Sequence, residues 1–182
     1  MSFDLNSLQD DFRKGKKLRF VFFWKPEQAG AVGPGCFSQW QSAPFTVDGA
    51  RYVSAEQYMM AEKARLFDDA EARRAILAVS SPARIKLLGR ETRGFDQNEW
   101  ERHRERIVLQ GNMAKFRQNG ALRVFLLHTG DKVLAEASPK DRIWGIGLAE
   151  EDKTAHNPLL WKGKNLLGFI LMRVRAELRL DI

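Results

Sequence analysis

The sequence predicts a mainly α-helical fold of the α+β class, organised as one compact domain, and three observations support this prediction. The chain has 182 residues, a length that fits one domain. Helix-start signals recur from Ser54 onward, whereas strand-like runs are short and lie mostly near the amino terminus. No repeat, linker or low-complexity segment divides the chain. The helices are therefore expected to form most of the core.

The first predicted elements are extended. Residues 18–24 (LRFVFFW) form a short aromatic and apolar run, which is typical of a buried strand. Residues 26–35 are rich in glycine, alanine and proline and predict a loop. Asp48 and Gly49 stand between apolar flanks, which is a strong signal for a tight hairpin turn. A small β-element is therefore expected before the helices.

The helices follow in order. Ser54 with Gln57 three residues later matches a capping box, so a helix is predicted over 55–67. Gly111 interrupts the longest helical pattern. A glycine there lowers the stability of the helix by about 1 kcal/mol relative to alanine, which indicates a bend or a close contact. The remaining predictions are helices over 69–79, 82–89, 96–116, 121–128 and 165–180, a strand over 133–137, and an ordered loop over 141–164.

Composition excludes several classes of protein. Apolar residues make up 44% and charged residues 29%, which argues against disorder and against a fibrous or repeat design. No apolar run approaches the roughly 20 residues that span a bilayer, so no membrane partner is expected. The amino terminus carries no secretion signal and Cys36 is the single cysteine, which favours a cytoplasmic location. The three histidines are scattered, so neither a metal site nor a cofactor is expected.

The net charge of +7 leaves three explanations open. A basic surface can bind nucleic acid. A basic pocket can receive a phosphorylated small molecule. The charge can also serve solubility alone. The sequence carries no signal for a particular oligomeric state.

Glu56 and Lys63 are the first candidate pair. With Met60 they stand at positions i, i+4 and i+7 of the predicted helix and share one face. The two charged residues are then about 10 Å apart along the axis, which can bracket a ligand the size of a sugar. The alternative interpretation is two solvated charges on an exposed face.

A second candidate group follows the predicted strand over 133–137. Glu136, Asp141 and Trp144 stand in a segment that continues into two glycines, and loops of this kind frequently carry sites. The alternative is a turn that Asp141 caps and Trp144 anchors to the core.

Aromatic and basic residues form the third group. Ser38 and Trp40 follow the glycine-rich loop, and Trp100 stands on the longest helix. Flat rings suit a flat base, although most tryptophans anchor cores and loops. Lys86 and Arg90, at i and i+4, can hold a phosphate or can be ordinary surface charges.

Taken together and in this order, these segments resemble the NADAR (YbiA-like) family. The resemblance covers about residues 18–178 and implies a NADAR domain over 18–180, behind an amino-terminal extension over 1–17, with small β-hairpins. Ser38-Gln39-Trp40 stands where many members have Ser-Asn-Phe, and Gln57 stands where histidine is frequent. The matching residues are Phe37-Ser38-Gln39-Trp40, Pro44-Phe45, Asp48-Gly49, 54–58, Lys63-Ala64, Lys86, Leu88-Gly89-Arg90, Trp100, Lys115-Phe116, Leu127, Thr129-Gly130, 136–138, Asp141, 144–147 and 161–168.

The resemblance implies an N-glycosidase, a hydrolase that breaks the bond between the anomeric carbon of a ribose and a nitrogen. It further implies Lys63 as a Schiff-base nucleophile and Glu56 as the acid/base. A carboxylate of Glu56 or Asp141 would stabilise the positive charge on the ribose. Trp100 or Trp144 would stack on the base, and Lys86 and Arg90 would hold the phosphate. The further residues predicted to bind substrate are Ser38, Trp40 and Glu136.

Three hypotheses for the function follow. The first is hydrolysis of phosphorylated ribosyl intermediates of riboflavin biosynthesis. The second is removal of ADP-ribose from guanine in nucleotides or nucleic acid, which the positive charge would suit. The third is a non-catalytic module that binds nucleotides, which needs no aligned Glu56 and Lys63.

Overall fold

A computed structural model describes residues 3–28 and 30–181 of the chain. Residues 1–2 of the expected amino-terminal extension lie outside the described residues, and so does residue 29 of the expected loop over 26–35. The chain divides into two compact units. We call Met1–Ser38 with Ala121–Ile182 the terminal unit, and Gln39–Gly120 the central unit.

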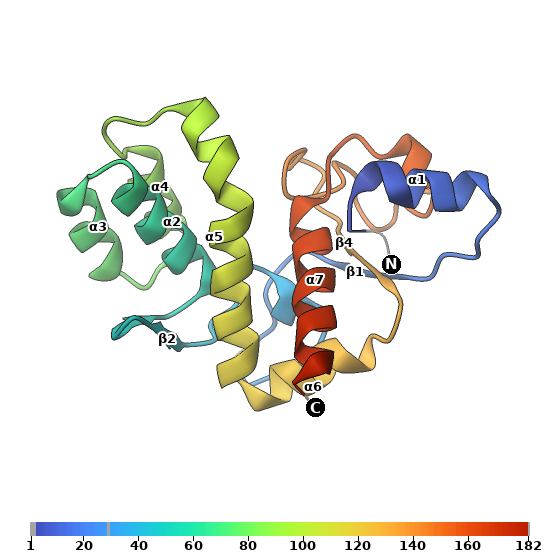
Figure 1. The fold of residues 1–182 in the computed structure, drawn as a ribbon, viewed down its shortest axis with the longest axis horizontal. Helices are drawn as coiled ribbons and strands as arrows, with labels where there is room; N and C mark the ends of the chain where they lie inside the picture. The colour runs from blue at the N-terminus through green and yellow to red at the C-terminus, as the bar shows by residue number, and fades with distance from the viewer. Residues whose placement is uncertain (1–2, 29, 182) are drawn as a thin grey trace. The chain divides into compact units, whose positions relative to one another are not determined.

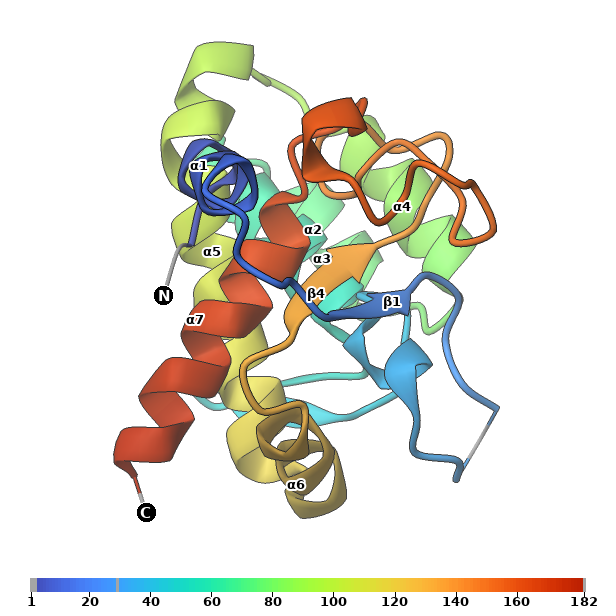
Figure 2. The same ribbon diagram turned by 90° about the vertical axis from the view of Figure 1, so that its right-hand side faces the viewer.

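The terminal unit is built around two short parallel strands. β1 (Phe20–Phe23) pairs with β4 (Val133–Glu136), so that Phe20 lies opposite Val133 and Phe23 opposite Glu136. Helix α7 (Leu166–Leu180) packs on β4, as Figure 2 shows. The remaining elements of this unit are α1 (Leu5–Arg13), the short 3-10 helices η1 (Pro34–Phe37) and η2 (Pro158–Leu160), and α6 (Gly120–His128), whose first residue belongs to the central unit.

Asn165 fixes the start of α7 against β4. Its backbone is left-handed, with φ 53°, and its amide donates to Leu134 O at 3.0 Å and accepts from Glu136 N at 3.0 Å. Gly168 lies in the first turn of the same helix, and a Cβ there would stand 2.1 Å from Leu134 O. Only glycine permits this close approach of the helix to the strand.

The central unit is a group of four helices beside a hairpin. Strands β2 (Phe45–Val47) and β3 (Ala50–Tyr52) are antiparallel and are joined by Asp48 (φ 50°) and Gly49 (φ 77°). Helix α2 (Ala55–Leu66) lies at the centre, because it contacts all three other helices (Figure 1). These are α3 (Ala70–Leu77), α4 (Pro82–Arg90) and α5 (Gln97–Gln118).

Side-chain caps explain where the helices of the central unit begin. Ser54 accepts from Gln57 N at 3.2 Å, as the predicted capping box requires. The Gln57 side chain does not complete the box. Its oxygen accepts from Val53 N, and its nitrogen donates to Ile76 O and Val79 O, which ties α2 to α3. Asp69 and Asp96 accept from backbone N–H groups in the first turns of α3 and α5.

The mainly helical fold with little β-structure is confirmed. The predicted hairpin is present, and each predicted helix has a counterpart with similar bounds. Helix α1 was not predicted from the sequence. Asp4 caps it by accepting a hydrogen bond from Ser7 N at 2.8 Å. It also did not predict that the strands over 18–24 and 133–137 pair in parallel, because such a pairing joins segments that are distant in sequence.

Gly111 marks a close contact, which is one of the two predicted alternatives. A Cβ at this position of α5 would stand 2.5 Å from the ring of Tyr58 on α2. The tyrosine ring therefore packs directly on the backbone of α5. Among the described residues, no helix is long and apolar enough to cross a bilayer.

Candidate functional site

Lys63 lies in the last turn of α2 and is buried, with 8% of its surface exposed. Its Nζ donates to Gly89 O at 2.8 Å. The same atom lies 4.1 Å from the centre of the Phe95 ring and 6.0 Å from that of Trp100. Aromatic rings attract a cation but also exclude water from it. The amine is therefore held in a largely apolar environment by one carbonyl.

The pKa of the Lys63 amine is lowered from its usual value. Burial is the largest cause, because it penalises the charged form, and the positive charge of Arg90 acts in the same direction. Arg90 is exposed at the end of α4, the helix that also provides Gly89. A larger fraction of Lys63 is consequently neutral at a given pH, as a nucleophilic amine requires.

Gly89 allows α4 to approach α2 at this point. A Cβ on Gly89 would stand 2.1 Å from Met60 Sδ, which is closer than real Cβ atoms come, and 3.0 Å from Met60 Cβ, which is a tight contact. The hydroxyl of Thr92 also donates to Gly89 O, at 3.0 Å. The carbonyl that receives the Lys63 amine is thus positioned by close helix packing and by a second hydrogen bond.

Glu56 lies in the first turn of the same helix and is also buried, with 4% of its surface exposed. Its backbone N donates to Gln39 O at 2.9 Å. The helix dipole favours a negative charge in this first turn. Seven residues separate Glu56 from Lys63, which is about 10 Å along the axis. Neither residue is a solvated charge on an exposed face.

Gln39 and Asn112 join the start of α2 to α5. Asn112 Nδ2 donates to Gln39 Oε1 at 2.9 Å and to Val108 O at 2.9 Å. The next residue, Trp40, is partly exposed, and Lys86 Nζ lies 5.7 Å from its ring centre. The central unit therefore brings Trp40 together with Lys86, and Lys63 together with Arg90 and Trp100.

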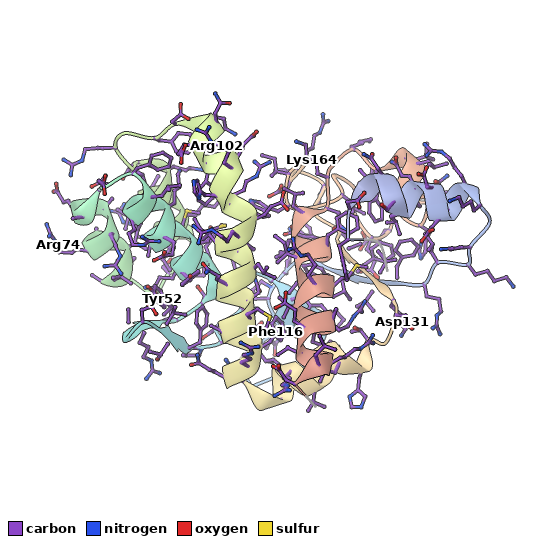
Figure 3. All side chains as sticks on the ribbon, in the orientation of Figure 1. Tyr52, Arg74, Arg102, Phe116, Asp131 and Lys164 are labelled. Carbon is purple, nitrogen blue, oxygen red and sulfur yellow. The ribbon has the colours of Figure 1, made fainter. Side chains whose placement is uncertain are left out.

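Figure 3 shows that exposed charges of the central unit, such as Arg74 and Arg102, lie at its periphery. The candidate residues Glu56, Lys63 and Trp100 are instead buried within the helices.

The other candidates belong to the terminal unit. Ser38 is buried and follows η1, and the backbone N of Glu136 at the end of β4 donates to Asn165 Oδ1. Asp141 accepts from Ile143 N at 2.9 Å and from Trp144 N at 2.8 Å. The carboxylate thus caps a turn, which is the alternative role that its sequence context indicated. The catalytic and binding roles of these residues stay predictions.

Two features of the site had little or no sequence signal. Phe95 and Thr92 lie between predicted helices and belong to no motif. Phe95 contacts the Lys63 amine, and Thr92 donates to Gly89 O, the acceptor of that amine. Asn112 is one polar residue on a long helix with many. Gln39 stands within a matching motif, and that was the available signal. Among residues 3–28 and 30–181, no group of three or more His, Cys, Asp or Glu side chains is arranged to bind a metal.

Comparison with known proteins gives a consistent result. The model of the NADAR domain family matches residues 22–179. The chain is 45% identical over 164 residues to an N-glycosidase of Acanthamoeba polyphaga mimivirus, covering 87% of this chain and 96% of that protein. It is 34% identical over 147 residues to the N-glycosidase YbiA of Escherichia coli, covering 81% and 83%.

A solved structure and a longer protein are also similar to this chain. The NMR structure of Escherichia coli YbiA matches with a TM-score of 0.72 and 31% identity, covering 90% of this chain and 86% of that one. A riboflavin biosynthesis protein of Vibrio vulnificus is 32% identical over 179 residues, which are 98% of this chain but 44% of that protein.

Proposed function

Because this chain belongs to the NADAR domain family and is an N-glycosyl hydrolase, we propose that its substrate is a phosphorylated ribosyl intermediate of riboflavin biosynthesis. The bond cleaved would join the anomeric carbon of the ribose to a base or amine nitrogen. The name of the Vibrio relative supports this pathway, and the relatives named N-glycosidase support the reaction type. The observation that carries the mechanism is the buried Lys63 amine with its lowered pKa.

Lys63 would act as the nucleophile. Its neutral amine forms a bond to the anomeric carbon as the bond to the base nitrogen breaks, and the departing nitrogen keeps the electron pair. Transfer of a proton from the bound amine to the ring oxygen breaks the bond between that oxygen and the anomeric carbon, which opens the sugar ring and gives a protonated Schiff base. Water then adds to the C=N bond, and cleavage of the C–N bond releases the sugar as an aldehyde and restores the amine. Gly89 O would orient the amine for this attack.

Glu56 would be the acid/base. The departing nitrogen needs a proton, and a carboxylic acid within hydrogen-bonding reach of it supplies one. Glu56 then takes a proton from the attacking water, so the carboxylic acid is regenerated at the end of the cycle. Its burial in the first turn of α2 keeps bulk water from competing for that proton.

The positively charged residues near Lys63 support a phosphate on the sugar. The positive charge of Arg90 contributes to the lowered pKa of Lys63, and its guanidinium would bind a phosphate on the same ribose. Lys86 lies over Trp40, and this pair would hold the base by stacking. Trp100 lies beside the amine and would also exclude water from it. The predicted role of Asp141 in stabilising the charge on the ribose is tested by measuring turnover of the Asp141→Asn variant, which should be slower than that of the wild type.

A second candidate substrate is ADP-ribosylated guanine in a nucleotide or nucleic acid. The net charge of +7 favours it, because this substrate carries more phosphate than a ribosyl monophosphate. The chemical step would be the same. Comparison of kcat/KM for the two substrates decides between them.

Borohydride trapping tests the mechanism. Reduction during turnover should fix the sugar to Lys63, which peptide mass spectrometry locates, and Lys63→Ala should abolish both the adduct and the turnover. Lys153→Ala, at an exposed lysine of the terminal unit, should change neither. Full activity in Lys63→Ala would exclude the Schiff base. Glu56→Gln should lower kcat by about 100-fold, within the range for loss of a general acid.

A further inference from the structure

The ring of Phe95 lies against the Lys63 amine and is also partly open to solvent. The amine nitrogen lies 4.1 Å from the centre of the ring, well inside the roughly 6 Å within which a ring face attracts a cation. Phe95 is 41% exposed, whereas Lys63 is 8% exposed. The ring is therefore accessible to a substrate, and its face contacts the atom that would form the bond to the sugar.

The position of the Phe95 ring is determined by contacts that do not involve Lys63. The ring packs edge-on against that of Phe67, with 5.3 Å between their centres. Two residues earlier, the backbone N of Arg93 donates to Asp69 Oδ2 at 2.8 Å, and the Arg93 guanidinium lies 3.0 Å from the same carboxylate. The ring is thus held in place before any charge forms beside it, which is the condition for electrostatic catalysis.

The charge on the Lys63 nitrogen changes during the proposed reaction. The amine is neutral when its lone pair attacks the anomeric carbon, and the electron pair of the broken bond leaves with the base nitrogen. The lysine nitrogen is then positively charged, and it keeps this charge in the protonated Schiff base. A contact that is stronger with the cation than with the neutral amine accelerates this step.

Few groups beside the amine can stabilise this positive charge. Across residues 3–28 and 30–181, no carboxylate lies within ion-pair distance of Lys63 Nζ, and the charge of Arg90 on α4 opposes a second cation there. The carbonyl of Gly89 and the rings of Phe95 and Trp100 remain, and Phe95 is the closer ring, at 4.1 Å against 6.0 Å. Carboxylates on α2 and α5 and at the start of α3 are paired with arginines instead: Glu62 with Arg65, Glu101 with Arg104, and Asp69 with Arg93.

We propose that Phe95 is a catalytic residue, whose ring face stabilises the positive charge that forms on the Lys63 nitrogen as the base departs. An aliphatic side chain would cover the amine as well, but it has no π electrons to attract the cation. The inference rests on the proposed function and deepens it, because it adds to the reacting group a residue that belongs to no sequence motif.

Fluorinated phenylalanines at position 95 test this role. Mono-, di- and trifluorinated rings withdraw electrons from the ring face step by step with little change in size. The rate of base release is measured in a single turnover, with a ribosylaminopyrimidine phosphate or ADP-ribosylguanosine as substrate, whichever is cleaved. This step precedes hydrolysis of the Schiff base. The rate should fall with each added fluorine, by about 3- to 30-fold over the series, and Phe95→Leu should lose a similar factor.

Phe20 provides the matched control. It is a partly exposed ring of the terminal unit that packs on the rings of Phe22 and Trp161. The same fluorinated series at position 20 should leave the rate of base release unchanged. Thermal unfolding of every variant reports whether it folds, and the Phe95→Leu variant provides a second measurement if a fluorinated protein does not.

The pH dependence separates attraction of the cation from exclusion of water. A ring that attracts the cation favours the charged amine, so fluorination of Phe95 should lower the pKa of Lys63 further. The rising part of the plot of base release against pH should then move to lower pH. A ring that only excludes water would leave this part of the plot unchanged, because fluorination does not open the site to solvent.

Two results would overturn the inference while the proposed function stands. The first is a rate of base release that does not change over the fluorinated series at Phe95, with the sugar still trapped on Lys63 by borohydride. The second is an equal loss of rate in the series at Phe20. Failure of the proposed function gives a different result. The wild-type protein would then release no base or form no adduct on Lys63, before any change at Phe95, and both proposals would be wrong.

Discussion

Replacing Gly89 by alanine should destabilise the protein through a single steric contact. The new Cβ would stand 2.1 Å from Met60 Sδ, 2.7 Å from Met60 Cγ and 3.0 Å from Met60 Cβ. Rotation of the Met60 side chain removes the first two contacts but not the third, so the backbones of α2 and α4 must separate. Overpacking of this kind costs about 1–3 kcal/mol, and the helix propensity of alanine returns up to about 1 kcal/mol.

The expected net loss is about 1 kcal/mol, which for a chain of this length lowers the unfolding temperature by roughly 2–4 °C. Activity should fall as well. Gly89 O accepts from the Lys63 amine at 2.8 Å, and a shift of α4 moves this acceptor away from the nucleophile. Displacement of a reacting group by about 1 Å can lower a rate by 100-fold, so we expect kcat to fall by about 10-fold or more.

Two further variants test the cause. Gly120→Ala places a Cβ where no atom lies within 4 Å, so its unfolding temperature should match the wild type. Met60→Ala combined with Gly89→Ala should lose less stability than the two single changes together, by about 2 kcal/mol, because the clash is absent in the double variant. The steric reasoning is refuted if Gly89→Ala melts at the same temperature as Gly120→Ala, or if the two losses add.

Two other predictions concern the charge of Lys63. Arg90→Gln removes a positive neighbour and should raise the pKa of Lys63. The rising part of the plot of kcat against pH, which reflects loss of the amine proton, should therefore move to higher pH. Arg84→Gln, on the same helix, should leave this part of the plot unchanged. Lys63→Met should abolish turnover. It should also raise the free energy of unfolding by about 1 kcal/mol, and so the unfolding temperature by roughly 3 °C at pH 7, because a buried cation is removed. Since the folded protein favours the neutral amine, this gain should shrink as the pH rises through the pKa of Lys63, and a stability loss at pH 7 would contradict the argument.

The elements that the sequence predicts correctly are those determined by local chemistry. The hairpin follows from Asp48 and Gly49, whose positive φ angles suit a two-residue turn. The starts of α2 and α5 follow from the side chains of Ser54 and Asp96, which accept hydrogen bonds from the first turn. Each of these signals lies within a few residues of the feature that it determines, so one sequence suffices to find it.

Features that depend on contacts between distant segments could not be predicted in the same way. The parallel pairing of β1 with β4 depends on residues far apart in the chain. Gln57 matched a capping box, but its side chain is used by the carbonyls of Ile76 and Val79, because a buried amide donates to whichever acceptor the packing brings near. Asn112 had no distinguishing signal, since its importance arises only from its contact with Gln39.

Helix α2 shows why the sequence predicts that Glu56 and Lys63 share one helix face but does not predict that both are buried. Every residue from Ala55 to Ala64 is buried, including Glu62 and Lys63, although the sequence of this helix has no continuous apolar face. Buried charges are unfavourable unless they are paired. Glu62 is paired, because Arg65 lies 2.8 Å from its carboxylate.

The contacts of Lys63 differ from those of Glu62. Within the described part of the chain, no carboxylate lies within ion-pair distance of its amine, which contacts a carbonyl and two aromatic rings instead. A methionine would fill this position without the desolvation penalty. A lysine retained at such a position therefore contributes little to stability, and its lowered pKa is what a nucleophilic amine needs.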